Sequence, residues 1–107
     1  MRVSIEARSA FERLIQRDPD HLDHYYDYAQ MLAAMGNHSE ALVQLNTALA
    51  YCPFEPEWNL EAAASYLALE DLERAQAFIA VAAESLSAVD ETALISFRLQ
   101  TLRKHLP

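Results

Sequence analysis

The sequence has very little of the chemistry that tight turns, disulfides and membrane spans require. Its 107 residues contain one glycine, four prolines and one cysteine. A single glycine cannot supply the turns of a hairpin-rich β fold or a glycine-rich phosphate loop, and the lone Cys52 has no internal disulfide partner. There is neither a run of about 18 apolar residues nor the apolar core of a signal peptide. We therefore expect a cytoplasmic protein.

Positive charge is scarce too. The chain has 8 Lys and Arg against 16 Asp and Glu, which gives a formal net charge of −8 at pH 7. No Lys or Arg occurs between Arg17 and Arg74, whereas eleven Asp and Glu fall in that interval. A surface of this charge repels a phosphate backbone and an anionic membrane. The sequence therefore predicts no nucleic-acid partner and no membrane partner. A basic partner, or a charge that serves only solubility, remains open.

Alanine and leucine are abundant and β-branched residues are few, a balance that predicts an all-α protein. The stronger signal is an internal repeat. Residues of matching size recur at a spacing of 34: Ala41 and Ala75, Leu45 and Ile79, Ala48 and Ala82, and Pro19 and Pro53. Thirty-four residues before Ala41, Leu45 and Ala48 lie Ala7, Phe11 and Leu14. A spacing shared by three segments indicates that they are related helical units.

This pattern resembles the tetratricopeptide repeat, a 34-residue pair of antiparallel helices named A and B. The middle segment supplies compatible residues at the positions that define the family: Tyr25, Tyr28, Ala29, Leu32, Ala41, Leu45, Ala48 and Pro53. The next segment departs from the family at Asn59, where an aromatic residue is usual, and at Ser87, where proline is usual. The resemblance implies a right-handed α-solenoid, because one helix pair cannot bury its apolar face without a neighbour.

The resemblance also implies a single domain over residues 1–107. Its parts are half a repeat over 1–20, repeats over 22–55 and 56–89, and a C-terminal capping helix over 90–105. About six helices are expected, at residues 3–17, 21–35, 38–51, 56–69, 72–87 and 90–105. Asp90 is the expected N-cap of the last helix, whose apolar face consists of Leu94, Ile95, Phe97 and Leu102. That face should pack on the preceding helix.

Histidines and aspartates gather in the segment DPDHLDHYYDYAQ, residues 18–30. At α-helical spacing, Asp20 and His24 are four residues apart and His24 and Asp27 are three apart, which suits two or three metal ligands. No cysteine or further ligand pattern accompanies them, and carboxylates are favourable at a helix N-terminus for structural reasons alone. We therefore predict no metal site, no cofactor and no catalytic residue, so that the protein is not an enzyme.

Proteins with this repeat usually bind their ligand in the concave groove of the A helices, and the resemblance carries that groove over to this chain. The expected groove residues are Asp23, Tyr26, Asp27, Gln30 and Ala33 from the middle repeat, and Glu57, Leu60, Glu61, Ala64 and Leu67 from the next repeat. Its floor is small and apolar, its rim is acidic, and no cation is expected on it. Such a groove favours an apolar or amphipathic protein segment with basic flanks.

Two functions remain open at this stage. The first is a binding module, a small acidic cytoplasmic chaperone or adaptor that is similar in class to the repeat-type chaperones of bacterial type III secretion. The second is a structural scaffold or self-assembling subunit that forms a homodimer through the open face of its N-terminal helix. The stripe on that helix consists of Val3, Ala7, Ala10, Phe11, Leu14 and Ile15. A competing interpretation of the groove is that the chain's own last helix covers Leu60 and Leu67.

Overall fold

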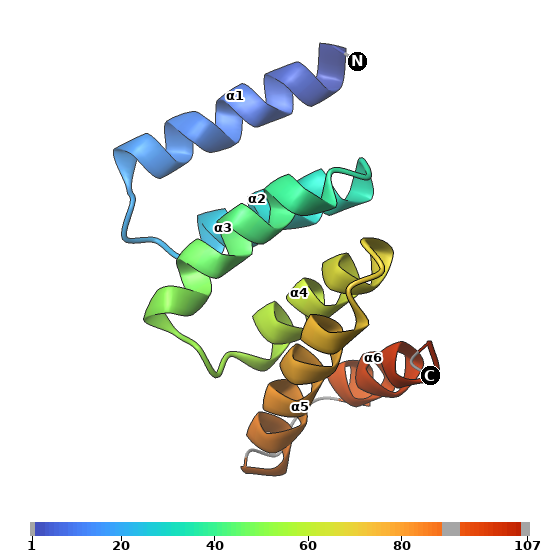
Figure 1. Cartoon of the computed structure of the whole chain (residues 1–107). Coiled ribbons are helices and arrows are strands. Elements are labelled where there is room, and N and C mark those ends of the chain that lie inside the picture. The colour runs from blue at the N-terminus through green and yellow to red at the C-terminus, as the bar shows by residue number, and fades with distance from the viewer. Residues whose placement is uncertain (1, 89–92, 106–107) are drawn as a thin grey trace.

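The computed structural model describes the backbone of residues 2–88 and 93–105, and the side chains of residues 5–85 and 98–105. It contains the helices α1 (Arg2–Arg17), α2 (Asp23–Ala34), α3 (His38–Tyr51), α4 (Pro56–Ala68), α5 (Leu72–Ala88) and α6 (Ala93–Arg103) (Figure 1). No strand occurs in these described ranges, so the predicted all-α class is confirmed. The expected cap Asp90 and the side chains of Val3, Leu94, Ile95 and Phe97 lie outside the described residues.

The helices stack in the order of the sequence. Helix α2 packs against α3 and α4 packs against α5, while α1 and α6 lie at the two ends of the stack (Figure 1). Helix α3 contacts α4, and α5 contacts α6, so that each pair meets the next element. Helix α2 also contacts α4, and α4 contacts α6, which brings the even-numbered helices side by side. This is the arrangement of a helical solenoid of the predicted type. Within the described residues, no helix combines the length and apolarity that crossing a bilayer requires.

Fully buried alanines lie where the repeat pattern places them. Ala41 and Ala75 are both 0% exposed, and so are Ala48 and Ala82. A methyl group is the largest side chain that lets two helices approach closely at such a position. Larger residues fill the neighbouring space: the rings of Phe11 and Tyr28, and of Tyr66 and Phe78, pack with centroids 5.2 Å apart. The alanines that the 34-residue spacing relates on α3 and α5 therefore occupy equivalent buried environments, whereas Leu14 on α1 is 40% exposed.

The departure at Asn59 has a local explanation. Asn59 is 2% exposed, and its Nδ2 donates hydrogen bonds to the backbone oxygens of Pro53 (3.0 Å) and Glu55 (2.8 Å). Those carbonyls belong to the turn between α3 and α4, so the amide side chain fixes the entry into α4. The neighbouring Trp58, 7% exposed, joins the main core cluster and supplies the aromatic packing that the pattern placed one residue later.

The two helix pairs also turn in the same way, and the turns show the repeat in the backbone. Gly36 has φ 84°, and the N–H of Asn37 donates to the oxygen of Leu32 (2.8 Å), which is a Schellman cap. Thirty-four residues later, Glu70 has φ 62°, and the N–H of Asp71 donates to Tyr66 (2.9 Å). The second cap therefore places a glutamate in the left-handed conformation that glycine tolerates best.

These caps generate a paired prediction. Gly36→Ala should lower the free energy of unfolding by about 1 kcal/mol, because alanine tolerates a positive φ poorly. Glu70→Gly should raise it by about 0.5 kcal/mol, because glycine removes the left-handed strain but adds entropy to the unfolded chain. Urea unfolding followed by circular dichroism measures both changes.

The control is Gln76→Gly, at an exposed position inside α5 with an ordinary helical backbone. Glycine should destabilise the helix there by about 1 kcal/mol. If Glu70→Gly loses as much stability as Gln76→Gly, the left-handed strain at position 70 is not what limits this turn.

Candidate functional site

The side-by-side packing of α2, α4 and α6 creates one continuous surface. We call it the even-helix face, and its polar residues are Tyr26, Gln30, Glu57, Glu61 and Arg98. Tyr26 lies at its centre: the ring is tilted against that of Trp58 with centroids 6.3 Å apart, and Gln30 Nε2 donates a hydrogen bond to its hydroxyl oxygen (3.1 Å). Contacts from two helices therefore hold this half-buried side chain in place.

The surroundings of Tyr26 also keep its hydroxyl protonated. Burial raises the pKa of Tyr26, the carboxylates of Glu61 and Glu57 raise it further, and the nearby Arg98 lowers it in part. A neutral phenol keeps its proton for donation to an acceptor, while its ring offers apolar area. Tyr26 is thus an amphipathic side chain that is held in place by its neighbours, at a position where the sequence predicts a groove residue.

Arg98 on α6 pairs with Glu61 on α4. Arg98 Nη2 donates to Glu61 Oε2 at 2.6 Å, and Glu61 is 7% exposed. A carboxylate buried to this extent needs a charged partner, and Arg98 provides it. The expectation that this face lacks a cation is therefore wrong. The repeat pattern gives no signal for Arg98, because the last helix lies beyond the two complete repeats.

The apolar part of α4 is covered by α6. Leu60 is 1% exposed and lies in a core cluster with Leu99 (8%) and Leu102 (9%) of α6. Ala64 and Leu67 are partly buried at the edge of the same cluster. The interpretation that the chain's own last helix covers Leu60 and Leu67 agrees with this packing, and Leu102 makes the contact expected of it. Leu60 consequently has almost no surface for a partner.

The α2 part of the face is more accessible. Asp23, Asp27 and Gln30 are exposed, Ala33 is partly buried, and Glu57 on the neighbouring α4 is exposed. The predicted groove residues therefore fall into two groups. One group, on α2 and at Glu57, contacts solvent, and the other, centred on Leu60 and Glu61, is packed beneath α6.

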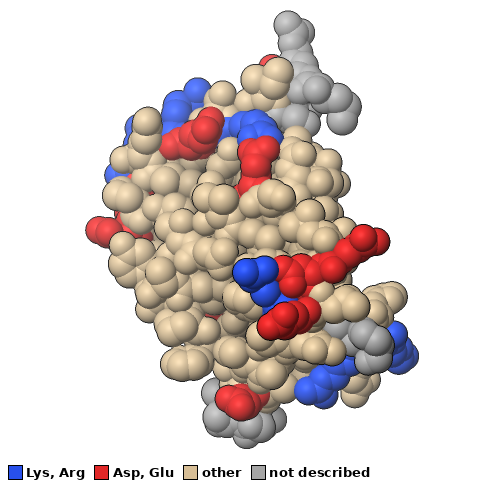
Figure 2. All heavy atoms as spheres, viewed as in Figure 1, with Lys and Arg blue, Asp and Glu red and all other residues tan. Residues whose placement is uncertain are grey.

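A second exposed surface lies over α3. Figure 2 shows Lys and Arg at the end near α1 and at the end near α6, and one further group of positive and negative side chains near the centre of the view. Val43 is 62% exposed, Tyr51 73% and Phe54 72%. The sequence analysis did not identify this patch, because the repeat pattern accounts for buried positions and carries no signal for the outer side of helix B.

The histidine-rich segment is arranged differently from the expectation. The structure brings together Asp18, His21 and His24, all of which offer metal-ligand atoms. Asp20 and Asp27, the aspartates that α-helical spacing favours as ligands, are not in that group. No described feature tests the prediction that no metal binds here, and the grouping of these three residues is the reason to reconsider it below.

Comparison with known proteins adds a family match. The family described as tetratricopeptide repeat matches residues 5–63, just over half of the chain, from α1 into the first half of α4. No curated protein matches the sequence.

The Glu61–Arg98 pair generates a prediction about how α6 is held. Arg98→Ala should lower the free energy of unfolding by about 1–2 kcal/mol, because it leaves a buried carboxylate without its partner. The value is modest because the Arg98 side chain is itself 37% exposed. Adding Glu61→Gln to Arg98→Ala should restore part of the loss, because a neutral amide is easier to bury than a carboxylate.

Gln100→Ala is the matched control, since it shortens an exposed side chain on the same helix. It should change stability by less than about 0.5 kcal/mol. If Arg98→Ala is as stable as Gln100→Ala, the ion pair does not hold α6. A coupling energy near zero between Arg98→Ala and Glu61→Gln in a double-mutant cycle would show the same.

Proposed function

Because the chain belongs to the tetratricopeptide repeat family, we propose that it is a protein-interaction module that binds a segment of a partner protein on the α2 part of the even-helix face. Families of this kind act by binding other proteins and are typically non-catalytic. The observation that supports the proposed position is Tyr26, a preorganised aromatic side chain next to exposed carboxylates. Aromatic anchors of this type supply much of the energy in protein interfaces.

The chemistry of the face favours a basic, amphipathic segment. Asp23, Asp27 and Glu57 are exposed on α2 and α4, and we infer that they form an acidic rim around Tyr26. Complementary charges mainly accelerate association and select the partner, whereas the apolar contacts supply affinity. An apolar side chain of the partner would contact Tyr26 and Ala33, and Lys or Arg residues at its flanks would meet the rim.

The chain itself contains an example of this recognition. Arg98 approaches Tyr26 from α6 and forms a charge-assisted hydrogen bond with Glu61. A basic residue of a partner would make the same kind of charge-assisted hydrogen bond with the exposed carboxylate of Asp27 or Glu57. The internal pair thus supports the choice of a cationic rather than an anionic partner.

We extend the proposal to a small cytoplasmic chaperone or adaptor, with the guarding of a subunit in bacterial type III secretion as one setting. The support for this extension is the small size, the net charge of −8 and the likeness in class noted from the sequence. An acidic surface keeps such a protein dispersed while it carries an apolar segment.

A second candidate function is self-assembly through α1. Phe11 and Ile15 pack on the core, but Ile5 is 65% exposed and Leu14 40% exposed on the same helix. Exposed apolar side chains on a terminal helix of a solenoid offer a surface to another helix. A homodimer that pairs two copies of α1 would cover them.

Peptide selection tests the first proposal. Peptides selected from a random displayed library against the pure protein should combine apolar residues at helical spacing with Lys or Arg at the ends. Their affinity should fall at least about tenfold in Tyr26→Ala and in the double variant Asp27→Lys, Glu57→Lys, because these changes remove the anchor and reverse the rim. Affinity should also fall with rising salt.

Glu12→Lys makes a comparable charge reversal on α1 and should leave peptide affinity unchanged. Acidic selected peptides, or equal affinity in wild type, Tyr26→Ala and the double reversal, would contradict the proposed face. Sedimentation of the same samples decides the alternative, because self-assembly through α1 requires a concentration-dependent dimer that Ile5→Glu with Leu14→Glu abolishes.

A further inference from the structure

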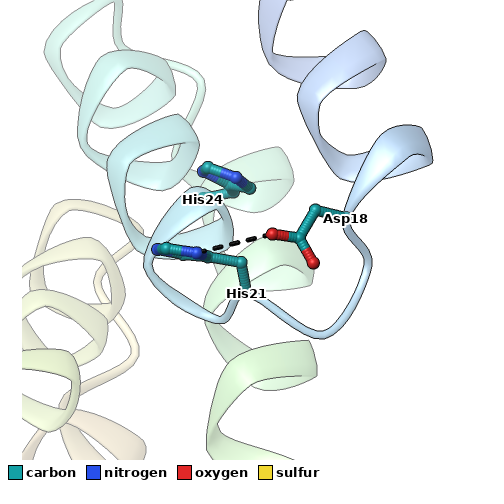
Figure 3. A group of neighbouring side chains, drawn as sticks. All are labelled: Asp18, His21 and His24. Carbon is teal, nitrogen blue, oxygen red and sulfur yellow. Dashed lines mark ion pairs between the residues drawn. The ribbon is translucent and has the colours of Figure 1, made fainter.

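The turn between α1 and α2 brings one carboxylate and two imidazoles together. Asp18, His21 and His24 each offer one ligand atom, and the three atoms lie within 4.8 Å of one another. Asp18 Oδ2 is 3.6 Å from His21 Nδ1, and the rings of His21 and His24 stack with centroids 4.3 Å apart. Figure 3 shows the Asp18 carboxylate directed towards the His21 ring, with the His24 ring stacked beside it.

The backbone explains why these three side chains share one side of the turn. The N–H of His21 donates to the oxygen of Asp18 (3.2 Å), and the N–H of His24 donates to the oxygen of His21 (3.1 Å). Two successive bonds of this kind advance the chain by three residues per turn, and side chains three apart then eclipse one another. The Tyr25 hydroxyl donates to the oxygen of Pro19 (3.1 Å), which fastens the turn to α2.

We propose that Asp18, His21 and His24 form a binding site for one divalent transition-metal ion of the zinc or nickel type. Imidazole nitrogen with carboxylate oxygen is a ligand set that these ions accept, whereas magnesium and calcium require mainly oxygen. Bonds of about 2.0–2.2 Å to zinc place neighbouring ligand atoms roughly 3–4 Å apart. The observed spacing is wider and the two rings are stacked 15° from parallel, so binding requires these exposed or half-buried side chains to rotate until a nitrogen of each ring faces the ion.

The residues around the group favour a bound cation. His21 Nε2 lies 3.7 Å from Asp23 Oδ2, on the side of the ring away from Asp18. A metal-bound histidine usually donates its second ring N–H to a carboxylate, which orients the ring and strengthens the ligand. Asp23 is placed for that role, and the neighbouring Asp20 adds negative charge. Three protein ligands at an exposed position leave the remaining coordination sites to water, so the ion exchanges readily.

Metal binding at this place would link two helices. Asp18 directly follows α1, and His24 lies in the first turn of α2. Helix α1 is otherwise held by the stacking of Phe11 on Tyr28 and by the exposed Arg8–Glu40 ion pair (2.6 Å). An ion that bridges the turn would therefore stabilise the docking of α1 on the rest of the stack.

Calorimetric titration of the untagged protein with ZnCl2 and with NiCl2 tests the site. We expect one ion per chain, with affinity weakened at least about tenfold in His24→Ala and in Asp18→Asn. Zinc should raise the melting temperature of the wild type and not that of His24→Ala, because a ligand stabilises only the state that binds it.

Two controls separate this site from other donors. His105→Ala removes an exposed histidine near the C-terminus, and Cys52→Ser removes the exposed thiol; both variants should bind the metal as the wild type does. His21→Ala, also at an exposed position, repeats the test if His24→Ala loses helical circular dichroism. Absence of binding, binding that survives His24→Ala and Asp18→Asn, or binding lost in either control would overturn the proposal.

Discussion

The close approach of helices at buried alanines is the interaction on which this structure depends. Ala41 and Ala48 on α3, and Ala75 and Ala82 on α5, are all 0% exposed. Protein interiors are packed as densely as organic crystals, so a methyl group at such a contact leaves no room for a larger side chain. The aromatic residues pack beside these contacts and fill the space between helices. The 34-residue repeat therefore repeats small, fully buried contact positions on α3 and α5.

This spacing also determines which residues can act together. Because each helix pair stacks on the last, α2, α4 and α6 lie next to one another, and Tyr26, Glu61 and Arg98 meet although they are far apart in the sequence. The same stacking gives the two parts of the even-helix face different solvent exposure. Around Leu60 it belongs to the core, since α6 covers it, whereas around Tyr26 it stays accessible with an acidic rim. The Glu61–Arg98 pair shows that a guanidinium group is accommodated on this face next to Tyr26.

The 34-residue repeat predicted the features that recur with it, the helices and their buried positions, and gave no signal for residues that occur only once. Expected and observed helix ends differ by at most three residues, because the apolar spacing and the turn residues define them together. Arg98 escaped prediction because the residues one and two periods earlier are Ala64 and Gln30, so the repeat carries no signal for a cation at this position. The grouping of Asp18 with His21 and His24 escaped it because Asp18 precedes the helix expected at 21–35, whereas the hydrogen bond from the His21 N–H to the Asp18 oxygen places Asp18 beside that helix. Trp58 takes the aromatic packing expected at position 59, because the buried amide of Asn59 instead donates hydrogen bonds to carbonyls of the preceding turn.

The most direct test of the central claim is the stability cost of enlarging the repeated alanines. Ala41→Leu and Ala75→Leu should each lower the free energy of unfolding by about 1–3 kcal/mol, because a leucine overpacks the contact between helices. Ala80→Leu, on the exposed side of α5, should change it by less than about 0.5 kcal/mol. A similar cost at positions 41 and 75 is the predicted result of urea unfolding. If either leucine is tolerated as well as Ala80→Leu, close helix contact at the alanines is not what holds the stack together.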